Sequence, residues 1–90
     1  MRIDKFLKLS GLVKRRTLAQ EMIEIGAVRL NGRVVKSSAE LHGGERIEIA
    51  FPRRVLAILA LSVDERTLKR GEPAASILEE RRLSEDERPW

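Results

Sequence analysis

Two adjoining segments decide the fold of this chain: VKRRTLAQEMIEIG at residues 13–26 and AVRLNG at residues 27–32. In the first segment, apolar side chains recur four and then three residues apart, which is the spacing of one helical face. That face consists of Leu18, Met22 and Ile25. The segment therefore predicts an amphipathic helix whose apolar stripe packs against the rest of the chain.

Residues near both ends of this segment indicate where the helix begins and ends. Thr17 and Gln20 match the Ser/Thr-x-x-Glu/Gln capping box, which places the helix start at Thr17 or up to one turn earlier. Gly26 suits the position just past the helix end, where the backbone needs a positive φ.

Three consecutive cations, Lys14, Arg15 and Arg16, stand at the expected helix start. A helix N-terminus carries partial positive charge, so each cation there is unfavourable by about 0.3–1 kcal/mol. A bound phosphate would reverse this cost, because it would meet free backbone N–H groups as well as the three side chains. The alternative is a solvated basic turn.

The second segment predicts a β-hairpin. Asn31-Gly32 is the preferred two-residue type I′ turn, in which both residues take a positive φ. Pairing across it sets Leu30 opposite Arg33, Arg29 opposite Val34 and Val28 opposite Val35. In this register Arg29 projects away from the core.

A short helix is predicted ahead of these segments, at residues 2–9. Its apolar face consists of Ile3, Phe6 and Leu7. Asp4 stands one turn before Lys8, a spacing that favours an ion pair between them.

Two strands are predicted after the hairpin. Residues 46–51 alternate apolar and polar side chains, as a half-buried strand does. Residues 55–63 are apolar throughout. Their Leu and Ala content would suit a helix, but their length and the preceding Pro-containing turn favour a buried strand paired with residues 46–51.

The C-terminal third gives weaker patterns. Residues 64–72 are polar and indicate a loop, and residues 73–83 indicate a short helix with Pro73 in its first turn. Residues 84–90 are charged and predict a disordered tail, in which Trp90 is assigned no stacking role. The whole chain therefore predicts an α+β fold: two N-terminal helices packed on a small antiparallel sheet of hairpins, with a short C-terminal helix.

Charge is distributed unevenly along the 90 residues. Residues 1–54 hold 12 Lys/Arg and 6 Asp/Glu, a net charge of +6, whereas residues 55–90 hold 6 and 8, a net charge of −2. A basic body with a mildly acidic C-terminal part predicts a polyanion-binding face confined to the N-terminal part.

The composition disfavours several other classes of protein. There is no cysteine, which excludes disulfides, thiolate metal sites and cysteine nucleophiles. No apolar run reaches the length of a membrane span and no signal peptide is visible, so a cytoplasmic protein is expected. The only histidine, His42, precedes a Gly-Gly turn with no partner carboxylate beside it. We therefore expect no enzyme, no cofactor and no metal site.

Several of these residues, in this order and spacing, resemble the S4-type RNA-binding domain. The resemblance is carried by RIDKFL at residues 2–7, KRRTLA at residues 14–19, Gly26, and VRLNG at residues 28–32 followed by Val35 and Lys36. It covers residues 1–50 and implies two helices packed on a small antiparallel sheet. On this basis residues 1–63 are expected to form the S4-type domain, residues 64–83 a C-terminal loop and short helix, and residues 84–90 the tail.

The layout of the chain is similar to that of the short bacterial proteins of the RqcP group, which act in ribosome-associated quality control. Members of this group bind large ribosomal subunits that still carry peptidyl-tRNA after a stalled ribosome has split. The resemblance implies three partners: large-subunit ribosomal RNA, the P-site peptidyl-tRNA that the protein holds, and RqcH, which it assists in adding C-terminal alanine tails. A monomer is expected.

The resemblance places the RNA face on the cations of the first helix and of the second helix start. Thr17 falls where the family often has a small or polar residue near phosphate. Arg29, Arg33 and Lys36 extend the basic surface unless they form only a solvated strand face. The predicted RNA-binding residues are Arg2, Lys5, Lys8, Lys14, Arg15, Arg16, Thr17, Arg29 and Lys36. Because this face lacks aromatic side chains, shape and backbone recognition of structured RNA is favoured over base stacking.

Three alternatives stay open. The chain also resembles the small ribosome-associated heat-shock protein with an S4-type domain, which recycles free large subunits carrying nascent chains. That relative typically has a longer and more basic C-terminal extension, so the acidic C-terminal part of this chain favours the RqcP group. The other two alternatives are a general structured-RNA-binding module and a protein–protein adaptor that uses the acidic half.

Overall fold

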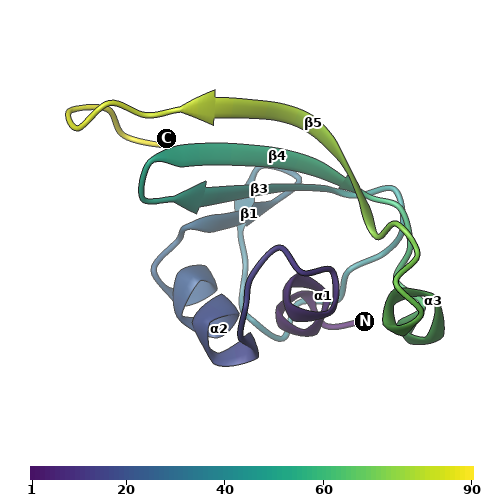
Figure 1. Cartoon of the computed structure of the whole chain (residues 1–90). Helices are drawn as coiled ribbons and strands as arrows, with labels where there is room; N and C mark the ends of the chain where they lie inside the picture. Colours follow the sequence, from purple (N-terminus) through teal and green to yellow (C-terminus); the bar gives the residue numbers. More distant parts are fainter.

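Two helices cover one face of a five-stranded antiparallel sheet in the computed structural model, which describes residues 1–90 (Figure 1). The elements, in chain order, are α1 (Ile3–Leu9), α2 (Arg16–Glu24), β1 (Val28–Leu30), β2 (Arg33–Val34), β3 (Arg46–Phe51), β4 (Arg54–Ala60), α3 (Glu65–Lys69) and β5 (Ala75–Arg82). The strand order is β2-β1-β3-β4-β5. The predicted α+β fold is therefore confirmed. None of the three helices is long and apolar enough to cross a membrane.

The core lies between α1, α2 and the sheet. The predicted apolar face of α1 is confirmed, since Ile3, Phe6 and Leu7 are fully buried. They meet the inward side chains of the central strands, including Ile49 of β3 and Ile58 of β4. Burying each such side chain stabilises the fold by about 1.5–3 kcal/mol, so this contact fixes α1 on the sheet.

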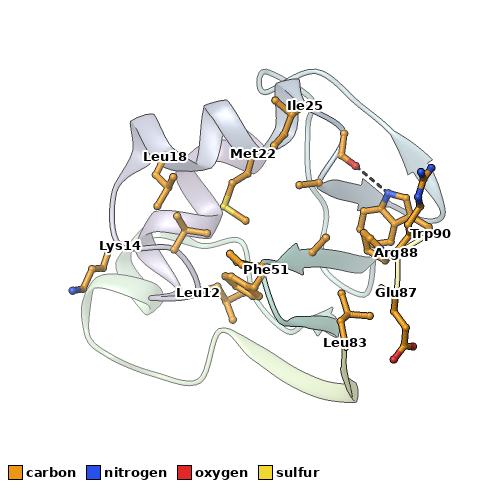
Figure 2. A pocket seen from close by; sticks show the side chains of 16 residues that line it. Leu12, Lys14, Leu18, Met22, Ile25, Phe51, Leu83, Glu87, Arg88 and Trp90 are labelled. Atoms are coloured by element: carbon orange, nitrogen blue, oxygen red, sulfur yellow. Dashed lines mark hydrogen bonds between the residues drawn. The ribbon is translucent and has the colours of Figure 1, made fainter. Parts of the chain in front are cut away.

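The orientation of α2 differs from the prediction. Leu18 and Ile25, two members of the predicted apolar stripe, are 42% and 80% exposed, and the helix instead buries Ala19 and Ile23. This rotation turns Gln20 toward α1, where its side chain donates a hydrogen bond to Asp4. The three side chains of the predicted stripe, Leu18, Met22 and Ile25, instead line an apolar groove beside the sheet, together with Leu12 and Phe51 (Figure 2).

The ends of α2 show why the capping box does not form. The helix begins at Arg16, inside the predicted range, but its N-terminus has no side-chain cap. Gln20 is engaged elsewhere, donating a hydrogen bond to Asp4 of α1. Gly26 follows the helix with φ +79°, as predicted.

The hairpin prediction is confirmed. Asn31 and Gly32 both have positive φ, 51° and 81°, as a type I′ turn requires. Two of the predicted pairs form, Arg29 with Val34 and Leu30 with Arg33, and β2 then ends, so the third pair is not part of the ladder. Residues 46–51 and 54–60 form the second predicted hairpin.

The C-terminal third was predicted wrongly in its elements. The expected loop contains α3, and the side chain of its N-cap residue, Asp64, accepts a hydrogen bond from the Arg66 N–H at 2.9 Å. The expected helix at residues 73–83 is strand β5, paired along β4. Local composition suits a helix there, but β4 offers a free edge whose backbone groups β5 satisfies, and such non-local pairing overrides weak propensity.

The tail also departs from the prediction. The indole N–H of Trp90 donates a hydrogen bond to the Gly26 carbonyl at 3.1 Å, and the Arg29 guanidinium lies 4.5 Å from the centre of its ring. Trp90 therefore does have a stacking role, through a cation–π contact, and it forms part of the wall of the apolar groove (Figure 2).

Candidate nucleic-acid interface

The Asp4 carboxylate joins the two helices. It lies in the first turn of α1 and is fully buried. It accepts hydrogen bonds from the Gln20 side chain at 2.8 Å and from the Lys5 backbone N–H at 2.8 Å. Arg2 reaches it through Nε and Nη2, both at 3.2 Å, and Arg16 Nε lies 3.3 Å away. The predicted pair of Asp4 with Lys8 is wrong, because Asp4 faces α2 rather than the last turn of its own helix.

The hydrogen bonds keep Asp4 ionised despite its burial. Burial alone would raise the pKa of this carboxyl, but hydrogen bonds from Gln20, Arg16 and the Lys5 N–H, with the Arg16 charge, hold the pKa below its ordinary value. A buried charge is tolerated only when it is paired and hydrogen-bonded, and Asp4 meets both conditions. Asp4 is therefore ionised at neutral pH, and the structure has a buried anion between two arginines.

Arg2 and Arg16 are held with one side against Asp4 and the other toward solvent. Their side chains are 47% and 42% exposed. Two guanidinium groups and one carboxylate leave a net positive charge at this point of the surface. Because Asp4 fixes both guanidinium groups, their outward N–H groups are ordered before any ligand arrives.

Lys5 joins these arginines at one hollow of about 390 Å³, lined by Met1, Arg2, Lys5, Arg16, Val63 and Glu65. Its ammonium lies 2.9 Å from a Glu65 carboxylate oxygen in α3, and Lys69 lies 3.0 Å from the same oxygen. These two cations hold the pKa of Glu65 below its ordinary value. Glu65 therefore restrains Lys5 as Asp4 restrains the arginines.

Four other predicted residues are exposed and make no ion pair. They are Lys8, Lys14, Arg15 and Thr17. Lys8 lies in the last turn of α1, and the other three lie within two residues of Arg16 at the start of α2. They add exposed positive charge to α1 and to the start of α2 and, at Thr17, a hydroxyl group.

The remaining two predicted residues lie in different places. Lys36 is exposed and lines a separate hollow with Ile23 and Glu24 at the C-terminal end of α2, not the hollow of Arg2, Lys5 and Arg16. Arg29 does not join the cluster. Its strand neighbours Val28 and Leu30 are buried on the helix side, so Arg29 projects from the opposite face of the sheet, against Trp90.

The sequence reasoning missed the residues that position the cations. Gln20 was interpreted as part of a cap and Asp4 as the partner of Lys8, yet both serve to place Arg2 and Arg16. One signal was available: Arg16 and Gln20 stand one turn apart on the same face of α2, so a single acceptor on α1 can serve both.

Comparison with known proteins agrees with this geometry. Residues 1–47 match the family model described as S4 domain, and two helices on a small antiparallel sheet with convergent cations define an S4-domain protein. Over 79 residues the chain is 39% identical to the RQC P-site tRNA stabilizing factor of Streptococcus pneumoniae, covering 88% of each chain. It is 38% identical over 88 residues to the protein of the same name from Bacillus subtilis, covering 94% of this chain and 100% of that one. The chain belongs to the family of RQC P-site tRNA stabilizing factors.

A solved structure shares the fold. The trimeric heat shock protein 15 of Vibrio cholerae superposes with a TM-score of 0.76 at 25% sequence identity, over 86% of this chain and 80% of that one. The shared architecture extends beyond the S4 match at residues 1–47 and therefore includes part of the C-terminal third.

Proposed function

We propose that this chain is a ribosome-associated quality control factor that binds large ribosomal subunits carrying peptidyl-tRNA and stabilises the P-site tRNA there. One observation carries the proposal: Arg2, Lys5 and Arg16 converge on one hollow, each restrained by a carboxylate, in a chain whose relatives are named for P-site tRNA stabilisation.

The mechanism is positioning. Each phosphate that a Lys or Arg neutralises contributes about 0.7–0.9 to the slope of log affinity against log salt concentration. The restrained arginines present fork-shaped donors that fit phosphate oxygens, and the unpaired cations add attraction over a longer range. A protein that contacts ribosomal RNA and tRNA at once lowers the dissociation rate of the tRNA, and it forms or breaks no covalent bond.

The finer parts of the proposal concern partners. The chain assists RqcH in adding C-terminal alanine tails, acts as a monomer in the cytoplasm, and has no catalytic role. Its predicted contacts to RNA are the six clustered cations Arg2, Lys5, Lys8, Lys14, Arg15 and Arg16, with Thr17 and Lys36 as additional contacts.

A second function deserves a test because of the fold shared with heat shock protein 15. In that case the chain would recycle free large subunits that carry nascent chains. The acidic balance of residues 55–90, 8 Asp/Glu against 6 Lys/Arg, favours the quality-control role.

The test is sucrose-gradient sedimentation of the tagged chain from its native cells, with tRNA probed in the recovered fractions. Co-migration with free large subunits enriched in peptidyl-tRNA is expected, together with loss of co-migration in Arg16→Gln. Arg33→Gln is the matched control, since it removes one exposed cation at the β1–β2 turn and should behave like the unmodified chain. Absence of the unmodified chain from ribosomal fractions would refute the proposal.

A further inference from the structure

We infer that the chain has a second phosphate-binding site, at the end of the sheet where β3 turns into β4, and that it takes an RNA backbone phosphate. The site is a hollow of about 490 Å³ lined by Phe51, Pro52, Arg53, Arg54, Glu80 and Arg82. We call it the arginine hollow. This inference rests on the proposed RNA-binding function and adds to it a surface outside the α1–α2 cluster, by which we mean the cations Arg2, Lys5, Lys8, Lys14, Arg15 and Arg16.

The strand register sets two like charges against each other. Arg54 of β4 stands directly opposite Arg82 of β5, in the last pair of the β4–β5 ladder. Like charges directly opposite each other on neighbouring strands are destabilising. An anion bound between the two arginines would be attracted by both and would offset their repulsion. The pairing of Arg54 with Arg82 is therefore the observation that points to a ligand.

The charges in the hollow are only partly compensated. Glu80 is its one carboxylate, and it pairs with Arg54 at 2.9 Å. Arg53 and Arg82 are exposed and pair with no carboxylate. Three guanidinium groups and one carboxylate leave a net charge of +2, and phosphate is the anion whose geometry guanidinium groups match bidentately.

One arginine of the hollow is already fixed. The Arg54 guanidinium lies 4.8 Å from the centre of the Phe51 ring, in addition to its contact with Glu80. An aromatic face and a carboxylate hold it in one orientation. The hollow therefore combines one ordered guanidinium with two mobile ones, as the α1–α2 cluster combines restrained and unpaired cations.

The position of the hollow favours RNA over an acidic protein segment. Phe51 lines both the arginine hollow and the apolar groove, and the lining of the groove also includes Lys14 (Figure 2). Lys14 of the basic turn and the arginine hollow thus border the same groove. A single nucleic acid can follow both, because its phosphates repeat along a continuous backbone.

The test measures affinity for purified large ribosomal subunits, and for protein-free large-subunit ribosomal RNA, at 50 to 200 mM KCl. The variant is Arg53→Gln with Arg82→Gln, which leaves Arg54 and its contacts in place. We expect the salt slope to fall by about 0.7–0.9, the contribution of one phosphate, so that this fourfold rise in salt weakens binding about threefold less than in the unmodified chain. The matched control, Arg33→Gln with Arg70→Gln, also removes two exposed arginines and should leave the slope unchanged.

Three outcomes would overturn the inference. A slope within 0.5 of the unmodified value, with Arg15→Gln still lowering it, would remove the second site and leave the proposed function intact. A change seen with whole subunits but absent with protein-free RNA would assign the hollow to an acidic protein segment instead. If neither Arg15→Gln nor the double variant changes the slope, the proposed function fails as well. Thermal unfolding of each variant checks that the fold is retained.

Discussion

Arg15 and Arg16 are neighbours in the chain, but only the Arg16 side chain is held by a carboxylate. Arg16 is held 3.3 Å from the buried Asp4 carboxylate, which also holds Arg2. Arg15 is exposed at the N-terminus of α2 and pairs with no carboxylate. The ordering of Arg16 is completed when the protein folds, whereas Arg15 would be ordered only when it binds. One residue type therefore supplies fixed geometry at one position and mobile charge at the next.

The largest loss of stability should come from removing the Asp4 carboxylate, which restrains Arg16 but not Arg15. Asp4→Ala leaves Arg2, Arg16 and Gln20 without their shared acceptor. Loss of one partner of a buried ion pair costs about 3–5 kcal/mol. Because both arginine side chains can be solvated instead, we expect Asp4→Ala to lower the free energy of unfolding, measured in urea, by about 2–4 kcal/mol. A loss below 1 kcal/mol would show that Asp4 does not organise the helix pair.

Protonation of Asp4 at low pH should destabilise the fold less than the replacement of Asp4 by alanine. The Asp4 pKa is lower in the folded state than its unfolded value of about 3.9, so its carboxylate stabilises the fold fully above that pH. This contribution is lost as the pH falls from there through the lowered folded value. Asp4→Asn lacks this contribution, so its unfolding free energy should change less between pH 5 and pH 3. Equal pH dependence in both proteins would contradict the assignment.

A pair of single variants sharpens the contrast between fixed and mobile arginines. Arg16→Gln should weaken binding to large subunits about tenfold and also lower stability by about 1 kcal/mol, because it removes a hydrogen bond to a charged group. Arg15→Gln should lower the salt slope by about 1 and leave stability within 0.5 kcal/mol of the unmodified chain. Equal effects of the two variants on stability would abolish the distinction.

The smallest effect should come from the tail. Trp90→Ala removes the cation–π contact with Arg29 and the hydrogen bond to Gly26. We expect a loss of about 1 kcal/mol in thermal or urea unfolding. Affinity for RNA should not change, and deletion of residues 85–90 should likewise leave it intact, since neither the hollow of Arg2, Lys5 and Arg16 nor the arginine hollow contains a residue of the tail. A clear loss of affinity would show that the tail takes part in binding.

How far the sequence predicts this structure depends on whether contacts are local. The Asn31-Gly32 hairpin and the apolar face of α1 follow from residues a few positions apart, and both are confirmed. The rotation of α2 does not follow, because the burial of Ala19 and Ile23 and the hydrogen bond from Gln20 to Asp4 outweigh the apolar pattern of the predicted stripe.

The candidate site divides in the same way. The cations themselves were predicted from their sequence positions, but their arrangement around Asp4 depends on a contact between two helices. Strand β5 shows the same limit, because its pairing with β4 is long-range and its own residues favour a helix. Residues whose state is decided by a distant partner were the ones predicted wrongly.

The most direct test of the central claim is the dissociation rate of P-site tRNA from isolated large ribosomal subunits, with and without the protein. The account predicts slower dissociation with the unmodified chain, and much less slowing with Arg16→Gln when both are used at a concentration near the Kd of the unmodified chain. A dissociation rate that the unmodified chain leaves unchanged, while it binds the same subunits, would contradict the account.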